Sequence, residues 1–310
     1  MIFSVVIPTF NRAQVLKRAL DSVLQQTLQD FEIVVVDDGS TDSTDQLLKG
    51  YQDPRLKVFR QPNSGLPSKA RNRGIGEARG EWTAFLDSDD YWLPDKLKKV
   101  EAALRTAPTN TIAVSHWEEE HRNGAKTKTL RHGTPIPSEF LYERLLLLGN
   151  CFSTSAMVVR TRDLQAMGGF DTRAEFRIVE DYELWLRIAR TRHPVVSLEE
   201  VLGVYSIQDD SISRDVEKLN QNLYEVLRFH IDQNISSATL RTLLHREAKA
   251  RTLYFASREY YRMGQYRTSF DSDLEALKAF PFGFKKWAQL FLATSGVLKG
   301  SRPPSQPKEK

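Results

Sequence analysis

The stretch that decides the fold is Glu32-Ile33-Val34-Val35-Val36-Asp37-Asp38-Gly39-Ser40. Its near-continuous apolar run is typical of a strand in a sheet that is covered on both faces. Two acids and a glycine follow the run, which indicates a turn at the end of the strand. Ligands bind at this end of the strands in open α/β sheets, so Asp38 is a candidate binding residue. The alternative is that the acids only form the turn and cap the next helix.

Further apolar runs alternate with helical patterns on both sides of this stretch. Strands are predicted at Phe3–Ile7, Glu32–Val36, Leu56–Phe59, Trp82–Leu86 and Ile112–Ser115. Residues with helical spacing or capping signals lie between them, at Val15–Leu24, at Ser43–Leu48 and from Pro94 to Leu104. The alternation predicts an α/β fold with a mostly parallel central sheet flanked by helices.

The remaining chain loses this alternation. Residues 122–137 are rich in Gly, Pro, Lys and Thr and predict a surface excursion, and helical patterns follow at 138–148 and 181–190. From about Val216 the pattern is helical, with a hairpin predicted across Gly264. We therefore expect three parts, which are an α/β domain over residues 1–214, a helical C-terminal extension over 215–300 and a disordered tail over 301–310.

Composition excludes several classes of protein. Hydrophobic residues make up 40% of the 310 residues and charged residues 27%, which excludes a wholly disordered chain. The single cysteine, Cys151, excludes an intramolecular disulfide framework and a multi-cysteine zinc site. No apolar run approaches the roughly 18 residues of a membrane span, and no basic leader precedes the first strand. We therefore expect a cytoplasmic protein.

The net charge of +4 is unevenly divided along the chain. Residues 215–310 carry a net charge of +6 and residues 1–214 carry −2. An excess of this size is too small to indicate a nucleic-acid partner, so none is expected.

A second acidic segment, Phe85-Leu86-Asp87-Ser88-Asp89-Asp90, follows another buried strand. Side chains two residues apart in an extended segment point the same way, so Asp87 and Asp89 can face one small volume. Two carboxylates at such a short distance repel each other unless a cation lies beside them. Carboxylate oxygens are suitable ligands for Mg²⁺ or Mn²⁺. Such a metal can hold a diphosphate. The alternative is a solvated acidic loop that caps the helix near Pro94.

Competing classes lack their own signatures. A dehalogenase-type phosphatase has a similar acidic spacing but requires Thr or Val where Tyr91 stands. A dinucleotide dehydrogenase requires a glycine-rich turn where this chain has Pro8-Thr9-Phe10-Asn11-Arg12, and no P-loop is present.

Two further segments carry candidate residues. The basic cluster Ser68-Lys69-Ala70-Arg71-Asn72-Arg73-Gly74 suits nucleotide phosphates or base, or else is an exposed helix start. Asp181 lies near the start of an amphipathic helix, where the helix dipole favours the ionised carboxylate of a base and neighbouring Glu180 opposes it. The alternative role for Asp181 is a helix N-cap.

Taken in order, these segments resemble the family 2 glycosyltransferases of the GT-A fold over about residues 2–214. The matching text is Ser4-Val5-Val6-Ile7-Pro8-Thr9-Phe10-Asn11-Arg12, Gln25-Gln26-Thr27, residues 32–42, Ala70-Arg71-Asn72-Arg73-Gly74, residues 85–90, Gly168-Gly169-Phe170-Asp171 and Glu180-Asp181. The resemblance implies a metal-dependent inverting enzyme. It would move a sugar from a nucleoside-diphosphate sugar, with UDP favoured, to an acceptor hydroxyl.

The resemblance also implies residue roles and partners. It places Pro8 and Phe10 beside the base, Asp38 in a hydrogen bond to the base, Arg71 in the nucleotide-contacting segment, Asp87 on the ribose, Asp89 on a Mg or Mn ion, and Asp181 as the catalytic base. The acceptor would be a glycan, a lipid-linked molecule or a protein, in polysaccharide, glycolipid or glycoprotein assembly.

One departure from the family pattern keeps a second hypothesis open. Many members carry Tyr-Arg-x-His where this chain has Tyr205-Ser206-Ile207-Gln208. Glutamine is a poorer ligand than histidine for a metal or diphosphate. The alternative function is therefore a non-catalytic sugar-nucleotide-binding or scaffold protein on the same fold.

The C-terminal extension carries an apolar stripe at near-helical spacing among lysines. The stripe consists of Phe284, Trp287, Leu290, Phe291 and Leu298, with Lys285, Lys286 and Lys299 around it. Such a helix suits peripheral contact with the inner face of an anionic membrane. The alternative is that the stripe docks on the protein's own core.

Overall fold

The computed structural model describes residues 1–133, 137–208, 215–282, 289–290 and 294. The chain forms two compact units, Met1–Ser211 and Ile212–Lys310, and each is described by itself. The stripe over residues 284–298, apart from Leu290, and the tail over 301–310 lie outside the described residues.

One half of the central sheet is parallel. It contains β1 (Phe3–Thr9), β2 (Phe31–Asp37), β3 (Leu56–Arg60) and β4 (Trp82–Phe85), in the order β3-β2-β1-β4. Every residue of β1 and β2 is buried, as the apolar runs predict. Thr9 pairs with Asp37 and Val6 with Phe85, so the carboxyl ends of these strands meet at one edge of the sheet.

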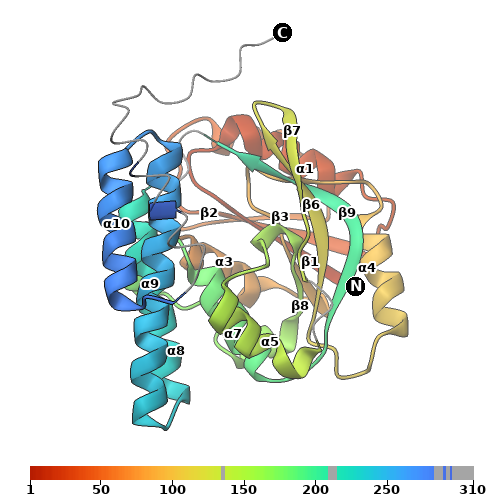
Figure 1. Cartoon of the computed structure of the whole chain (residues 1–310). Coiled ribbons are helices and arrows are strands. Elements are labelled where there is room, and N and C mark those ends of the chain that lie inside the picture. The colour runs from red at the N-terminus through yellow and green to blue at the C-terminus, as the bar shows by residue number, and fades with distance from the viewer. Residues whose placement is uncertain (134–136, 209–214, 283–288, 291–293, 295–310) are drawn as a thin grey trace. The chain divides into compact units, whose positions relative to one another are not determined.

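The other half of the sheet is mixed. It contains β5 (Tyr91–Trp92), β6 (Ala113–Arg122), β7 (Ala125–Leu130), β8 (Val158–Arg160) and β9 (Val195–Ile207). β8 is antiparallel to both β4 and β6, β9 is parallel to β6, and β5 is antiparallel to β9. The long strands β6 and β9 lie side by side (Figure 1). The α/β class is confirmed.

Within the predicted surface excursion, residues 122–130 form part of a hairpin. β7 pairs with β6 across Asn123-Gly124, and both turn residues have positive φ, at 51° and 77°. Asn-Gly is the preferred pair for such a two-residue turn, so the sequence did contain the signal. β7 pairs only with β6 among the described strands, which makes β7 an edge strand.

Helices cover both faces of the parallel half. The helices of this unit are α1 (Ala13–Leu24), α2 (Thr44–Lys49), α3 (Pro67–Glu77), α4 (Lys96–Thr106), α5 (Leu141–Leu148), α6 (Thr161–Ala166) and α7 (Glu180–Arg190). Val5 and Ile7 of β1 join the core cluster with Leu16 and Leu20 of α1. Val6 faces the opposite side, where a Cβ added to Gly74 of α3 would come within 2.4 Å of Val6 Cγ1. The alternation along β1 thus fixes α1 and α3 on opposite faces.

The second unit contains α8 (Val216–Asn234), α9 (Ala238–Arg262) and α10 (Tyr266–Ala279). The side chains of Asp215 and Ser237 cap α8 and α9 by accepting hydrogen bonds from backbone N–H groups three residues on. The predicted hairpin forms across Gly264, whose φ is 75°, between α9 and α10. Within the described residues, no helix combines the length and apolar character that crossing a membrane requires.

Candidate active site

The adjacent ends of β1 and β2 place Asp38 and Phe10 at one edge of the sheet. The Asp38 backbone N–H donates to Thr9 O at 2.9 Å, which continues the pairing of the two strands. The Asp38 carboxylate is buried and accepts hydrogen bonds from Gln61 Nε2 at 2.6 Å and from Ser64 Oγ at 3.0 Å. Phe10 is 41% exposed, although it is a large apolar residue, and Pro8 is buried within β1. An exposed ring beside a buried carboxylate can receive a planar base.

Asn11 fixes the loop that carries Phe10. Asn11 has a φ of 51°, its backbone N–H donates to Ser40 Oγ at 2.9 Å, and its Oδ1 accepts from Thr41 N at 2.8 Å. Gly39 has a φ of 83°, and a Cβ there would lie 2.7 Å from Asn63 N. Only glycine fits such a position without strain. The loops after β1 and β2 therefore hold each other in place.

The acidic segment after β4 divides into two kinds of carboxylate. Asp87 and Asp89 are partly exposed, whereas Asp90 is buried. Asp90 accepts hydrogen bonds from Ser155 Oγ at 2.6 Å and from the Ser206 backbone N–H at 2.8 Å. Burial, followed by the negative charge of Asp89, raises the Asp90 pKa well above its usual value. Asp90 thus fastens the segment to β9, whereas Asp87 and Asp89 remain partly exposed.

The donor set fits a metal that arrives with a nucleotide. The described part of the chain contains no group of three or more His, Cys, Asp or Glu side chains that could hold a metal ion by itself. Asp87 Oδ1 accepts a hydrogen bond from Arg71, and Asp89 lies two residues further on. Mg²⁺ in nucleotide sites is commonly bound by one or two carboxylates, by substrate phosphates and by water. This segment supplies one or two carboxylates for such a metal, from Asp87 and Asp89.

Arg71 is buried and joins the acidic segment to α7. Its Nη2 donates to Asp87 Oδ1 and its Nη1 to Glu180 Oε1, both at 2.7 Å. Burial lowers the Arg71 pKa, but the carboxylates of Asp87 and Glu180 outweigh that effect, so that the net direction is upward. The basic cluster is therefore not simply an exposed helix start, because its central arginine is a buried bridge.

Asp181 lies in the first turn of α7, beside the glutamate that Arg71 binds. Its Oδ2 accepts a hydrogen bond from Thr154 Oγ1 at 3.3 Å, and its Oδ1 accepts from the Tyr182 backbone N–H at 2.6 Å. Burial, reinforced by Glu180, raises the Asp181 pKa to about 7, although Arg71 acts in the opposite direction. The helix dipole was expected to favour the ionised form against the effect of Glu180, but burial dominates and the net shift of the Asp181 pKa is upward. A pKa near 7 suits a general base at neutral pH.

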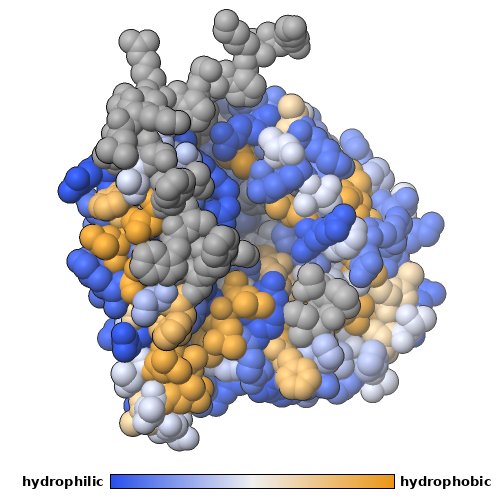
Figure 2. Space-filling model, viewed as in Figure 1, coloured by the Kyte–Doolittle hydropathy of each residue, from blue (hydrophilic) through white to orange (hydrophobic). Residues whose placement is uncertain are grey.

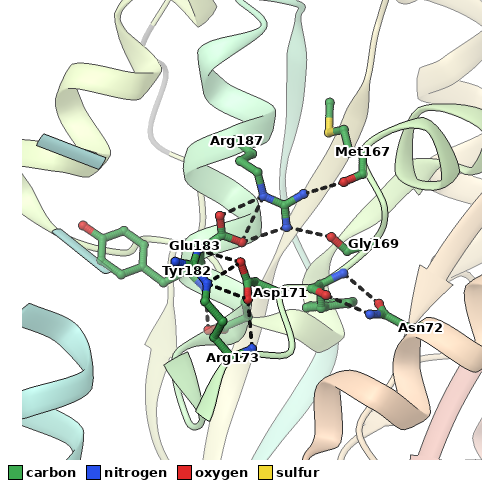
Figure 3. Close-up of polar contacts among 10 residues, drawn as sticks. Asn72, Met167, Gly169, Asp171, Arg173, Tyr182, Glu183 and Arg187 are labelled. Atoms are coloured by element: carbon green, nitrogen blue, oxygen red, sulfur yellow. Dashed lines mark hydrogen bonds and ion pairs between the residues drawn. The ribbon is translucent and has the colours of Figure 1, made fainter. Parts of the chain in front are cut away.

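A polar network fixes α7 to the glycine turn over Gly168-Gly169 (Figure 3). Arg187 forms an ion pair with Glu183 at 2.7 Å and donates to Gly169 O at 2.6 Å. Asn72 of α3 exchanges two hydrogen bonds of 2.7 Å with the Phe170 backbone. A Cβ at Gly169 would lie 2.3 Å from Asn72 Oδ1, and its φ is 69°, so both space and conformation require glycine. The network sets the position of α7 and therefore of Asp181.

The entry into α7 is strained. Ile178 lies two residues before the helix and has a φ of 82°, a conformation that β-branched residues rarely adopt. Such a residue costs about 1–3 kcal/mol and persists only where surrounding structure enforces it. Here the network around α7 is that surrounding structure.

The seven residues predicted from sequence thus fall into two groups of the first unit. Asp87, Asp181 and Arg71 belong to one network with Glu180, and Asp89 is two residues from Asp87. The second group, Pro8, Phe10 and Asp38, lies at the joined ends of β1 and β2.

Sequence reasoning missed two contributions to the site. Arg18 of α1 donates to Asp89 O at 2.7 Å and to Ser206 Oγ at 2.9 Å. The hydroxyl run Ser153-Thr154-Ser155 contacts three acids. No sequence motif marks Arg18 or the hydroxyl run, because their contacts join residues that lie far apart in the chain.

Comparison with known proteins agrees with this geometry. The mannosyltransferase PcManGT of Pyrobaculum calidifontis, solved with GDP-Man and Mn²⁺, superimposes with a TM-score of 0.62 at 21% identity, covering 97% of this chain and 81% of that one. The fold is that of the GT-A glycosyltransferases. Residues 4–166 match the model of glycosyl transferase family 2, and the chain belongs to that family.

Two curated relatives extend the comparison. An uncharacterized glycosyltransferase of Nostoc sp. is 37% identical over 179 residues, which are 55% of this chain and 54% of the relative. The Escherichia coli protein WfgD, a UDP-Glc:α-D-GlcNAc-diphosphoundecaprenol β-1,3-glucosyltransferase, is 28% identical over 225 residues, which are 72% of this chain and 84% of WfgD. The chain spans about half the length of the Nostoc protein and smaller shares of several other relatives.

Proposed function

We propose that the protein is a metal-dependent inverting glycosyltransferase that moves a sugar from a nucleoside-diphosphate sugar, with UDP favoured, to an acceptor hydroxyl. The observation that carries this proposal is the bridge made by Arg71, which bonds Asp87 and Glu180 at 2.7 Å each. Asp87 belongs to the metal-type segment, and Glu180 precedes Asp181. The bridge therefore links the donor side of the reaction to the residue that would accept the proton.

The nucleotide would bind at the joined strand ends. Phe10 and Pro8 would flank the base, and Asp38 would accept a hydrogen bond from it in place of, or beside, Gln61. Asp87 would bind the ribose and Asp89 the metal. When bound, the metal would neutralise charge on the departing nucleoside diphosphate.

Asp181 would take the proton from the acceptor hydroxyl as that oxygen attacks the anomeric carbon. The bond from the anomeric carbon to the diphosphate oxygen breaks in the same step, so a single displacement inverts the configuration. The pKa of about 7 leaves a large fraction of Asp181 ionised at neutral pH, and it also makes Asp181 more basic than an ordinary aspartate.

A lipid-linked diphosphate is the acceptor class we favour, because WfgD is named for such an acceptor. Peripheral contact of a cytoplasmic protein with the inner face of a membrane would bring the enzyme to it. The second unit exposes apolar side chains that include Leu243 and Phe255, and orange residues are visible on its helices in Figure 2. Flotation with anionic vesicles tests this contact. A protein that stays in the dense bottom fraction of the gradient while the vesicles float contradicts it.

Donor turnover tests the proposed activity. The purified protein is incubated with Mn²⁺ and UDP-glucose, UDP-N-acetylglucosamine or GDP-mannose, with and without a prenyl-diphosphate-linked N-acetylglucosamine acceptor. Metal-dependent release of nucleoside diphosphate is expected with one donor, and proton NMR of the product is expected to show an inverted anomeric configuration. Asp181→Asn is expected to bind this donor and to lose roughly 10²–10⁴-fold in rate.

The second candidate function is a sugar-nucleotide-binding scaffold. It is favoured by Ser206 and Gln208, which replace the arginine and histidine of many family members. Nucleotide-sugar binding by calorimetry without turnover of any donor would support the scaffold and contradict the enzyme.

A further inference from the structure

Three consecutive hydroxyl side chains each bind a different buried or catalytic-site acid. Ser153 Oγ donates to Glu118 at 2.6 Å, Thr154 Oγ1 to Asp181 at 3.3 Å, and Ser155 Oγ to Asp90 at 2.6 Å. The three acids come from β6, from α7 and from the segment after β4. We call residues Ser153, Thr154 and Ser155 the hydroxyl segment.

Both ends of the hydroxyl segment are fixed. On one side Glu118 is fully buried, and His132 Nε2 lies 2.9 Å from the oxygen that Ser153 binds. On the other side Ser155 O accepts from Trp92 Nε1 at 3.0 Å, and Ser155 Oγ accepts from the Asp87 backbone N–H at 3.1 Å. Thr154 itself is only 6% exposed. A buried threonine between two fixed serines has little freedom to move.

We propose that Thr154 is a positioning residue that orients the Asp181 carboxylate, and that the hydroxyl segment holds Thr154 in register with Asp87 and Asp90. The proposal deepens the proposed function and rests on it, because it takes Asp181 to be the general base. Thr154 touches neither donor nor acceptor in this scheme and acts only through Asp181.

The contacts of Asp181 show why Thr154 matters. The Tyr182 backbone N–H donates to Asp181 Oδ1, and the Thr154 hydroxyl donates to Asp181 Oδ2. Of the charged groups that act on Asp181, Glu180 and Asp87 disfavour its ionised form, and Arg71 favours it. A hydroxyl that donates to the carboxylate also favours the ionised form. Removing this hydroxyl should therefore leave Oδ2 unoriented and make Asp181 harder to ionise.

Replacing Thr154 by valine tests the proposal, because valine keeps the shape and removes the donor. Asp181 is titrated by carbon-13 NMR of labelled aspartate carboxyls, with its signal assigned by its loss in Asp181→Asn. Thr154→Val is expected to raise the titration midpoint by about one unit, since a hydrogen bond to a charged group has about that effect. Donor turnover is expected to fall about tenfold in kcat with little change in the donor KM.

Three variants serve as controls. Thr154→Ser restores the hydroxyl and is expected to return both readouts toward wild type. Thr161→Val removes another buried threonine hydroxyl, which lies 2.9 Å from Thr83 Oγ1, and is expected to change neither readout. Thr154→Ala replaces Thr154→Val in both measurements if the valine variant unfolds.

The outcomes separate this proposal from the proposed function. An unchanged Asp181 midpoint and unchanged kcat in Thr154→Val, or in Thr154→Ala, would overturn the positioning role. Wild-type protein that turns over none of the donors would instead contradict the proposed function. A shifted midpoint in that case would still establish the Thr154–Asp181 contact, since the titration needs no donor.

Discussion

The raised pKa of Asp181 has a consequence for stability that can be measured without any substrate. The pKa is about 7 in the folded protein against an ordinary value of 3.8. Below pH 4 both states carry the proton, so Asp181 contributes no difference. As the pH rises from 4 to 7 the unfolded chain releases the proton and the folded protein retains it, which stabilises the unfolded state. Above pH 7 the penalty is complete.

The magnitude follows from the size of the shift. A difference of about three pKa units corresponds to about 4 kcal/mol, which is the upper limit of the penalty. Asp181→Asn removes the titrating group and keeps the shape. We therefore expect Asp181→Asn to match wild type in stability near pH 4 and to exceed it by up to about 4 kcal/mol at pH 8.

Urea unfolding followed by tryptophan fluorescence at pH values from 4 to 8 measures this difference. Four of the five tryptophans, Trp82, Trp92, Trp117 and Trp185, lie in the first unit, so the signal reports mainly on that unit. Asp171→Asn is the matched control, because the ion pair with Arg173 lowers the Asp171 pKa against the opposing effect of burial. Its stability should lie below that of wild type by a nearly constant amount from pH 4 to 8, because a lowered pKa changes stability only below about pH 4. Equal stability of Asp181→Asn and wild type at every pH would refute a raised Asp181 pKa.

Three further predictions concern the remaining site residues. Arg71→Met should destabilise the protein by about 3–5 kcal/mol, because it leaves two carboxylates without their buried partner. Arg73→Met, which removes a half-exposed ion pair with Glu77 at 3.9 Å and a contact with the Phe59 ring, should cost about 1 kcal/mol or less in the same urea experiment, and equal costs would contradict the bridge. Asp89→Ala should abolish metal-dependent nucleotide binding in calorimetry with the fold intact; unchanged metal-linked affinity would exclude Asp89 as the ligand. Asp38→Ala should weaken UDP binding by roughly tenfold or more while Mn²⁺ dependence persists, and a crystal structure with the base away from Asp38 would refute its role.

Much of the first half of the fold was predictable because its signals are local. The apolar runs of β1 and β2 are continuous in sequence, and acids directly after a strand must lie at its carboxyl edge. β9 was not predicted, because Glu199 and Glu200 interrupt its apolar pattern and its pairing with β6 joins residues about 80 positions apart. Periodicity within a short window contains no information on such pairing.

The site shows the same division between local and distant causes. Asp38, Asp87, Asp89 and Asp181 could be named from motifs, but their surroundings could not. The basic, polar segment around Arg71 is compatible with an exposed side chain. In the structure Arg71 is buried and bonds to Glu180, which lies 109 residues further along the chain. The ionisation of Asp181 was expected from the helix dipole and from neighbouring Glu180, whereas burial, which depends on the folded chain, decides the direction of its pKa shift.

The lysines of β7 bear on how this protein behaves at high concentration. Lys126 and Lys128 form ion pairs with Glu119 and Glu120 of β6, and both lie on an edge strand. An edge strand offers unpaired backbone groups to a second molecule, and lysines on it oppose such pairing, because a new strand would have to bury their charge. Lys57 and Arg60 lie on β3, the strand at one end of the sheet. Basic side chains on β3 and β7 thus oppose aggregation by strand addition at these two edge strands, including during folding.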